Sequence, residues 1–182
     1  VLYAAETLFI PSLPSELGTV SPWVVSFLDG LFNKDRVASP LKRVFLSRKN
    51  VGTRHISNDT EVRLLFKAFG ITEFFPEDYS VTEFSSIIAG ATFIISVHGS
   101  GLSNICFASP GTVIVDLLAP YHQDCYYWLI SNLRQSRYIG FFSEGQHPDD
   151  NFDLVKNKID NDLYINVEQL KSLLDRELNR DK

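Results

Sequence analysis

The stretch from Phe93 to Asn104 constrains the fold of this chain more than any other part of the sequence. Its first five residues, Phe93 to Val97, form a largely apolar run with four β-branched or aromatic side chains, typical of a buried strand. A turn with Gly99 and Gly101 follows, and a short helix can begin near Leu102. A strand, a glycine turn and a helix start direct backbone N–H groups and a positive helix end at an anion. The stretch therefore predicts a phosphate-binding loop.

This turn also has a simpler interpretation, in which its serine and asparagine side chains only cap the helix. Two better-known glycine motifs do not fit the sequence. A dinucleotide-binding fingerprint needs a third glycine three residues after the second, where Asn104 stands. A hydrolase nucleophile elbow needs Gly-x-Ser-x-Gly, whereas Gly99 and Gly101 flank Ser100 directly.

Predicted strands and helices alternate along the whole chain. We expect strands at 7–11, 43–47, 71–75, 93–97, 112–118 and 137–142, with an edge strand at 163–167. Helices are expected from Ser21-Pro22, from 58–59 to Gly70, from Ser80 to Gly90, at 102–108, from Asp124 and at 168–178. This rhythm predicts one α/β domain over residues 1–182, a doubly wound, mostly parallel Rossmann-like sheet with a C-terminal extension at 143–182.

Candidate ligand-binding residues fall where predicted strands end, which is where ligands bind in such sheets. Arg48 follows a strand and could clamp a diphosphate, although a surface arginine that caps the next loop is the alternative. Arg54 is a weaker candidate. Asp116 lies late in an apolar strand and needs donors, either ribose hydroxyls or nearby backbone N–H groups. His98 could donate to a phosphate or hold the loop in place.

Composition and charge exclude several classes of protein. The 182 residues are 45% hydrophobic and 21% charged, which is ordinary globular usage and argues against disorder. The net charge of −5 argues against a general nucleic-acid-binding protein. A local basic cluster between Lys42 and Arg54 suits a small anionic ligand better than a polyanion.

The cysteines indicate the redox compartment of the protein, and the apolar runs indicate whether it carries a membrane helix or a signal peptide. Cys106 and Cys125 lie in apolar or aromatic sequence without a CxxC pair or a metal-ligand histidine, so we expect two free, buried thiols in a reducing compartment and no metal site. No apolar run approaches the ~18 residues that a membrane helix needs, and no signal peptide is visible. The chain contains no Met and begins with Val1-Leu2, so we expect it to be part of a longer protein.

Several short motifs between residues 7 and 138 together resemble glycosyltransferase family 61, which holds plant β-1,2-xylosyltransferase and protein O-linked N-acetylglucosaminyltransferases. They are Ser47-Arg48 with Arg54, Asn58-Asp59-x-Glu61, Glu83-Phe84…Gly90-Ala91, the signature His98-Gly99-Ser100-Gly101-Leu102-Ser103-Asn104, and Pro110-Gly111-Thr112…Asp116. Phe84, Ser100 and Asp116 stand where the family has Gln, Ala and Glu.

The resemblance implies the C-terminal, donor-binding Rossmann-like domain of a GT-B enzyme that binds a UDP-sugar without a metal and inverts the anomeric centre. The UDP-sugar is a substrate, and no cofactor is implied. The implied donor-binding residues are Arg48, His98, Gly99, Ser100, Gly101, Leu102, Ser103, Asn104 and Asp116. The acceptor would be a saccharide or glycoprotein, and the general base would come from an N-terminal acceptor-binding domain that we expect this chain to lack, so no catalytic residue is assigned.

Two alternatives to a donor-binding glycosyltransferase domain remain open. A degenerate family member could keep the fold for partner interaction. A Rossmann oxidoreductase is disfavoured by the missing third glycine. We expect no nucleic-acid partner and no membrane span, and a cytoplasmic or membrane-peripheral protein.

Overall fold

The computed structural model describes residues 7, 19–33, 36, 39–48, 52–120, 124–145 and 162–179, and within them five strands form one parallel sheet. Their order across the sheet is β2 (Thr72–Phe74), β1 (Arg43–Leu46), β3 (Phe93–Val97), β4 (Val113–Leu118) and β5 (Arg137–Phe142). Every pairing in this sheet is parallel. The predicted doubly wound Rossmann-like sheet is confirmed.

The strand order reverses between β1 and β3. The chain passes from β1 outward to β2 and then crosses back to place β3 on the other side of β1. Leu46 of β1 pairs with Ser96 of β3, so the residues that follow these two strands emerge next to each other. This is the switch point at which open α/β sheets bind their ligands.

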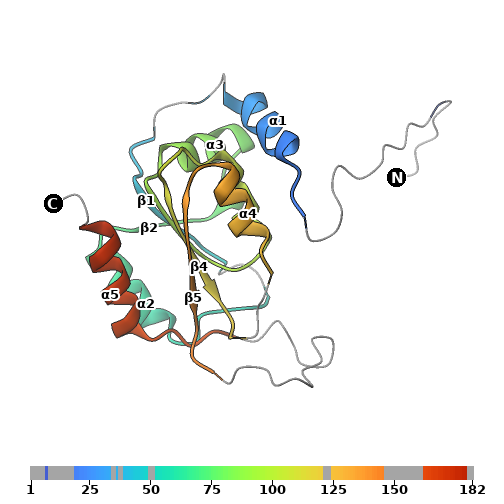
Figure 1. Ribbon diagram of the computed structural model, residues 1–182. Helices are drawn as coiled ribbons and strands as arrows, with labels where there is room; N and C mark the ends of the chain where they lie inside the picture. Colours follow the sequence, from blue (N-terminus) through green and yellow to red (C-terminus); the bar gives the residue numbers. More distant parts are fainter. Residues whose placement is uncertain are drawn as a thin grey trace, which may run out of the picture.

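Helices cover both faces of the sheet (Figure 1). One face carries α1 (Pro22–Asn33), α3 (Val81–Gly90), the 3₁₀ helix η2 (Ser100–Phe107) and α4 (Tyr126–Leu133), and the other carries α2 (Asp59–Ala68) and α5 (Val167–Leu178). A short 3₁₀ helix, η1 (Pro76–Asp78), follows β2. Strand β3 is buried along its whole length because it is covered on both faces, which explains its continuous apolar run.

Local sequence signals explain where the helices begin and end. Helix α1 begins at Pro22 directly after Ser21, as expected. Before α3, the Ser80 hydroxyl accepts from the Glu83 backbone N–H at 3.3 Å, and the Glu83 carboxylate accepts from the Ser80 N–H at 3.0 Å. This reciprocal pair is a capping box. Gly70, at a φ of 65°, follows the end of α2.

Two predicted elements differ from the structure, and a third lies mostly outside the described residues. The edge strand expected at 163–167 is wrong, since this segment makes two isolated bridges, Ile56 with Leu163 and Glu144 with Tyr164. Both amide atoms of the Asn58 side chain instead hold the Ile165 backbone, at 2.9 and 3.0 Å. The short helix expected at 102–108 is a 3₁₀ helix that already begins at position 100. The strand expected at 7–11 lies outside the described residues except for position 7.

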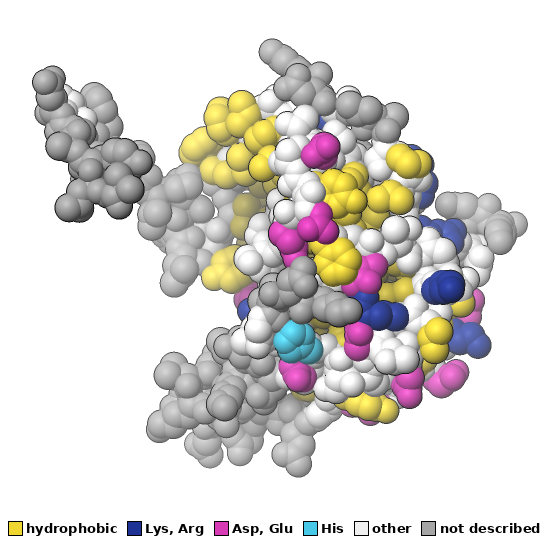
Figure 2. All heavy atoms as spheres, turned by 180° about the vertical axis from the view of Figure 1, so that it is seen from behind, with side chains coloured by type: hydrophobic (Ala, Val, Ile, Leu, Met, Phe, Trp, Pro, Cys, Tyr) yellow, Lys and Arg dark blue, Asp and Glu magenta, His cyan; other side chains and the backbone are white. Residues whose placement is uncertain are grey.

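Helix α1 buries only part of its apolar surface. Val25 is buried, and Leu28 and Phe32 pack against the core. Trp23, Phe27 and Leu31, which follow one another at four-residue spacing, remain 60%, 59% and 53% exposed. Hydrophobic side chains accordingly gather over α1, at the upper left of Figure 2. Helix formation there was predictable, whereas the extent of burial was not.

The cysteines are both free, and they differ in exposure. Cys106 is buried and Cys125 is exposed, which corrects the expectation that both thiols are buried. Cys125 is the N-cap residue of α4 and therefore lies before the residues of that helix that pack on the core. Burial raises the pKa of the Cys106 thiol to about 11. Among the helices of the described residues, none has the length and apolar character needed to cross a bilayer.

Candidate functional site

Arg48 and the turn after β3 meet at the switch point. Arg48 follows β1, and Gly99 follows β3 on the neighbouring strand. A Cβ atom placed on Gly99 would lie 2.0 Å from Arg48 Nη1 and 2.7 Å from Arg48 Cζ. The guanidinium therefore lies directly over the Gly99 backbone, an approach that only a glycine permits. The structure thus brings together two parts of the predicted phosphate site.

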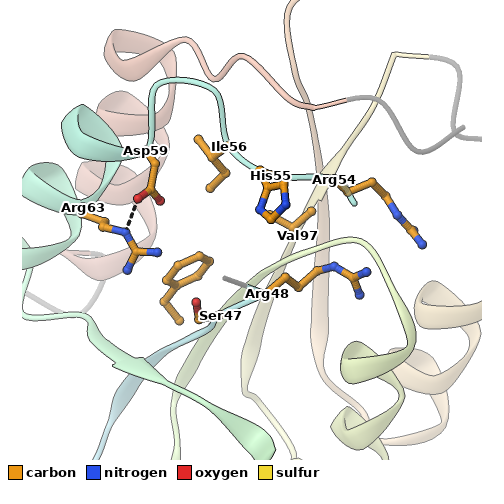
Figure 3. Close-up of a pocket in the computed structure, with 9 residues that line it drawn as sticks. Ser47, Arg48, Arg54, His55, Ile56, Asp59, Arg63 and Val97 are labelled. Carbon is orange, nitrogen blue, oxygen red and sulfur yellow. Dashed lines mark hydrogen bonds and ion pairs between the residues drawn. The ribbon is translucent and has the colours of Figure 1, made fainter. Parts of the chain in front are cut away.

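Arg54 reaches the same turn from the other side of the loop. Its Nη1 donates to the backbone carbonyl of His98 at 2.9 Å. Arg54 has a φ of 59°, a left-handed conformation that costs a non-glycine residue about 1–2 kcal/mol. In Figure 3 the side chains of Arg48 and Arg54 extend in the same direction, away from Arg63. Two guanidinium groups therefore converge on the residues that follow β3.

A pocket of about 120 Å³ lies behind these two arginines (Figure 3). Its lining residues come from β1, the loop before α2, α2 and β3: Phe45, Ser47, Arg48, Arg54, His55, Ile56, Asp59, Arg63 and Val97. Arg63 is held by two carboxylates, with Nε 2.5 Å from Asp59 and Nη1 paired with Glu73. Arg63 is therefore held by α2 and β2, and Arg48 and Arg54 lie at the glycine turn.

His98 lies between two carboxylates. Its side chain is 7% exposed, with Nδ1 2.8 Å from Asp116 Oδ2 and Nε2 3.0 Å from Asp124 Oδ2. The Tyr127 ring packs on the imidazole at a centroid distance of 4.8 Å. Because ionised carboxylates only accept hydrogen bonds, both contacts are satisfied together when both ring nitrogens carry protons.

Asp116 is fully buried and is fixed from β5. The register pairs Ile114 with Tyr138 and Asp116 with Gly140, so Tyr138 lies on the same face two residues away. The Tyr138 hydroxyl donates to Asp116 Oδ2 at 2.8 Å. Burial and the nearby Asp116 charge raise the pKa of Tyr138. Within the described residues, Asp116 Oδ1 has no hydrogen-bond partner.

The remaining residues of the predicted loop differ in accessibility. Ser100 and Ser103 are exposed, whereas Gly101 and Asn104 are half-buried, and Asn104 Nδ2 donates to the Gly101 carbonyl at 2.9 Å. Leu102 is a core residue, and its N–H donates to the Gly99 carbonyl at 2.8 Å. The roles of these residues toward a ligand stay predictions. Phe84, which replaces the family's Gln, is also in the core and stacks on Phe74 at 5.2 Å.

Sequence reasoning missed two members of the site. Tyr138 was expected only as part of a strand, and Asp124 was expected to open a helix. Helix α4 begins at Tyr126 with Cys125 as its N-cap residue, and Asp124 instead contacts His98. The alternation of Tyr138 and Gly140 in β5 was the one available signal. The predicted ribose contact of Asp116 stays a prediction, and no group of metal-binding side chains occurs in the described parts of the chain.

Comparison with known protein families gives one match that covers most of this architecture. Residues 2–115 match the family described as Glycosyltransferase 61, whereas a search of curated proteins found no match. The matched range contains β1, Arg48, the turn after β3 and the first half of β4, and it ends one residue before Asp116. Since it spans more than half of the 182 residues, the chain belongs to glycosyltransferase family 61.

Proposed function

We propose that this chain is the donor-binding domain of an inverting glycosyltransferase that uses a UDP-sugar without a metal ion. The observation that carries the proposal is the convergence of Arg48 and Arg54 on the glycine turn at the switch point. Guanidinium groups and backbone N–H groups are the donors that bind diphosphates in proteins. Family membership supports sugar transfer as the reaction.

The chemistry assigned to the site is stabilisation of the leaving diphosphate. When the bond between the anomeric carbon and the diphosphate breaks, negative charge develops on the phosphate oxygen. Arg48, Arg54 and the N–H groups of the turn after β3 would balance that charge in a metal-independent enzyme. Inversion requires an acceptor hydroxyl that attacks from the opposite face of the sugar.

The acceptor half of the reaction is assigned to an N-terminal domain. We expect this chain to form the C-terminal half of a GT-B enzyme, whose partner domain binds a saccharide or glycoprotein acceptor and supplies the general base. This chain alone would then bind the donor and turn over poorly. The fold supports such a division, because the switch-point site lies at the carboxyl end of the sheet, where a second domain can cover it.

Calorimetric titration of the chain with UDP in EDTA tests the proposal, with GDP and NAD as comparison ligands. We expect saturable UDP binding that is unchanged by added Mg²⁺ or Mn²⁺. Arg48→Ala should weaken it about tenfold or more, the effect of losing a hydrogen bond to a charged group. Lys171→Ala is the matched control, because it removes one exposed positive charge from α5, which contributes no residue to the pocket. Tighter binding of NAD than of UDP, or an unaffected Arg48→Ala variant, would refute the assignment.

A further inference from the structure

The two ring nitrogens of His98 face different surroundings. Nδ1 contacts Asp116, whose side chain is fully buried, at 2.8 Å. Nε2 contacts Asp124 at 3.0 Å, and the Asp124 side chain is 28% exposed. The partner of Nε2 is therefore the more accessible of the two carboxylates.

We propose that Asp124 occupies, in the ligand-free protein, the position that a phosphate oxygen of the donor takes at His98 Nε2. Donor binding then displaces the Asp124 carboxylate from the imidazole. The inference rests on the proposed function. It assigns a phosphate contact to His98 Nε2, and it makes Asp124 the residue that competes with the phosphate for this atom.

The charges around the ring support an exchange of one anion for another. Asp116, held by the Tyr138 hydroxyl at 2.8 Å, stays bonded to Nδ1 and keeps the ring oriented when Nε2 changes partner. A carboxylate and a phosphate both accept a charge-assisted N–H bond with similar geometry. An incoming phosphate therefore replaces Asp124 without leaving the ring proton unpaired.

The neighbouring arginines make this position better suited to a phosphate than to a carboxylate. Arg54 donates to the His98 carbonyl at 2.9 Å, and the Arg48 guanidinium lies over Gly99, the next residue. A phosphate carries more oxygens and more charge than a carboxylate, so positive charge in this part of the turn favours a phosphate over the Asp124 carboxylate. Helix α4 does not depend on the Asp124 side chain for its N-cap, which is Cys125.

The test compares wild type with Asp124→Ala in calorimetric titrations with UDP and, separately, with inorganic pyrophosphate. We expect both ligands to bind about two- to fivefold more tightly to the variant, the range that partly exposed ion pairs contribute. Asp175→Ala, which removes an exposed carboxylate from α5, should leave both affinities unchanged. In a His98→Gln background, Asp124→Ala should produce no gain.

The outcomes separate this inference from the proposed function. Absence of UDP binding to wild type contradicts the proposed function, and tighter pyrophosphate binding to Asp124→Ala would still support the exchange at Nε2. Equal or weaker binding of both ligands to Asp124→Ala overturns the inference, as does a gain that persists in the His98→Gln background.

Discussion

Replacing Gly99 by alanine tests the contact at the centre of the site. The new methyl group would lie 2.0 Å from Arg48 Nη1 and 2.7 Å from Cζ, so the guanidinium must leave its place over the turn. Arg48 is the flexible end of a long side chain, and it can rotate away at low cost to the fold. We therefore expect Gly99→Ala to remain folded but to lose the arginine from the ligand position.

The size of the effect follows from the interaction that is lost. A hydrogen bond to a charged group contributes about 1.5–3 kcal/mol, and a factor of ten corresponds to about 1.4 kcal/mol. UDP should thus bind about ten- to a hundredfold more weakly to Gly99→Ala than to wild type. Gly70→Ala is the matched control, because Gly70 also has a positive φ, lies outside the site, and has no heavy atom within 4 Å of an added Cβ atom.

A double-mutant cycle with Arg48→Ala identifies the cause of the change. If the methyl group acts by displacing the guanidinium, Gly99→Ala should have no further effect on UDP affinity once Arg48 is alanine. Calorimetry gives the affinities, and thermal unfolding of each variant checks that the fold is retained. The reasoning is refuted if Gly99→Ala binds UDP like wild type, or if it weakens binding equally in both backgrounds.

Three further changes test the surrounding structure. Tyr138→Phe removes a donor from the buried carboxylate of β4 and should lower the free energy of unfolding by about 1.5–3 kcal/mol in urea titration, whereas Tyr164→Phe, at a residue that is 50% exposed, should change it little. A thiol reagent at pH 8 should modify Cys125 rapidly and Cys106 only on unfolding, because burial raises the pKa of the Cys106 thiol from 9.0 to about 11; equal labelling of both thiols would contradict this. Since the thiol ionises at lower pH in the unfolded chain, the protein should also lose stability as the pH rises from 9 toward 11. Ser80→Ala breaks the capping box of α3 and should lower the unfolding free energy by about 1 kcal/mol, and an unchanged urea midpoint would count against the cap.

The parts of the fold that sequence predicted correctly are those determined by neighbouring residues. The run at 93–97 could only be a buried strand, and Ser80 with Glu83 specified the start of α3. Arg48 and the turn at 98–99 could be placed next to each other because parallel strands bring their carboxyl ends together. In each case the decisive interaction is local or follows directly from strand order.

The parts that sequence did not reveal depend on contacts between distant residues. For Asp116 the sequence suggested either ribose hydroxyls or nearby backbone N–H groups as donors. In the structure the side chain contacts His98 and Tyr138, which lie 18 and 22 positions away in the chain. Asp124 looked like a helix cap, and only the packing of α4 on the sheet places it beside the imidazole. The extent of burial of Phe27 and its neighbours on α1 also depends on tertiary packing, because apolar spacing shows that a helix forms and not how deeply it lies.

Strand β1 pairs on both sides with strands that follow it, and its pairing with β3 is the one pairing in the described sheet that joins non-consecutive strands. Arg48 and Gly99 meet across that pairing. Neither βα unit supplies both residues alone, so the proposed anion site forms only when β1 and β3 have paired. A ligand bound there stabilises the native state against complete opening. It should therefore slow amide hydrogen exchange throughout β1, β3 and β4, including amides far from the ligand.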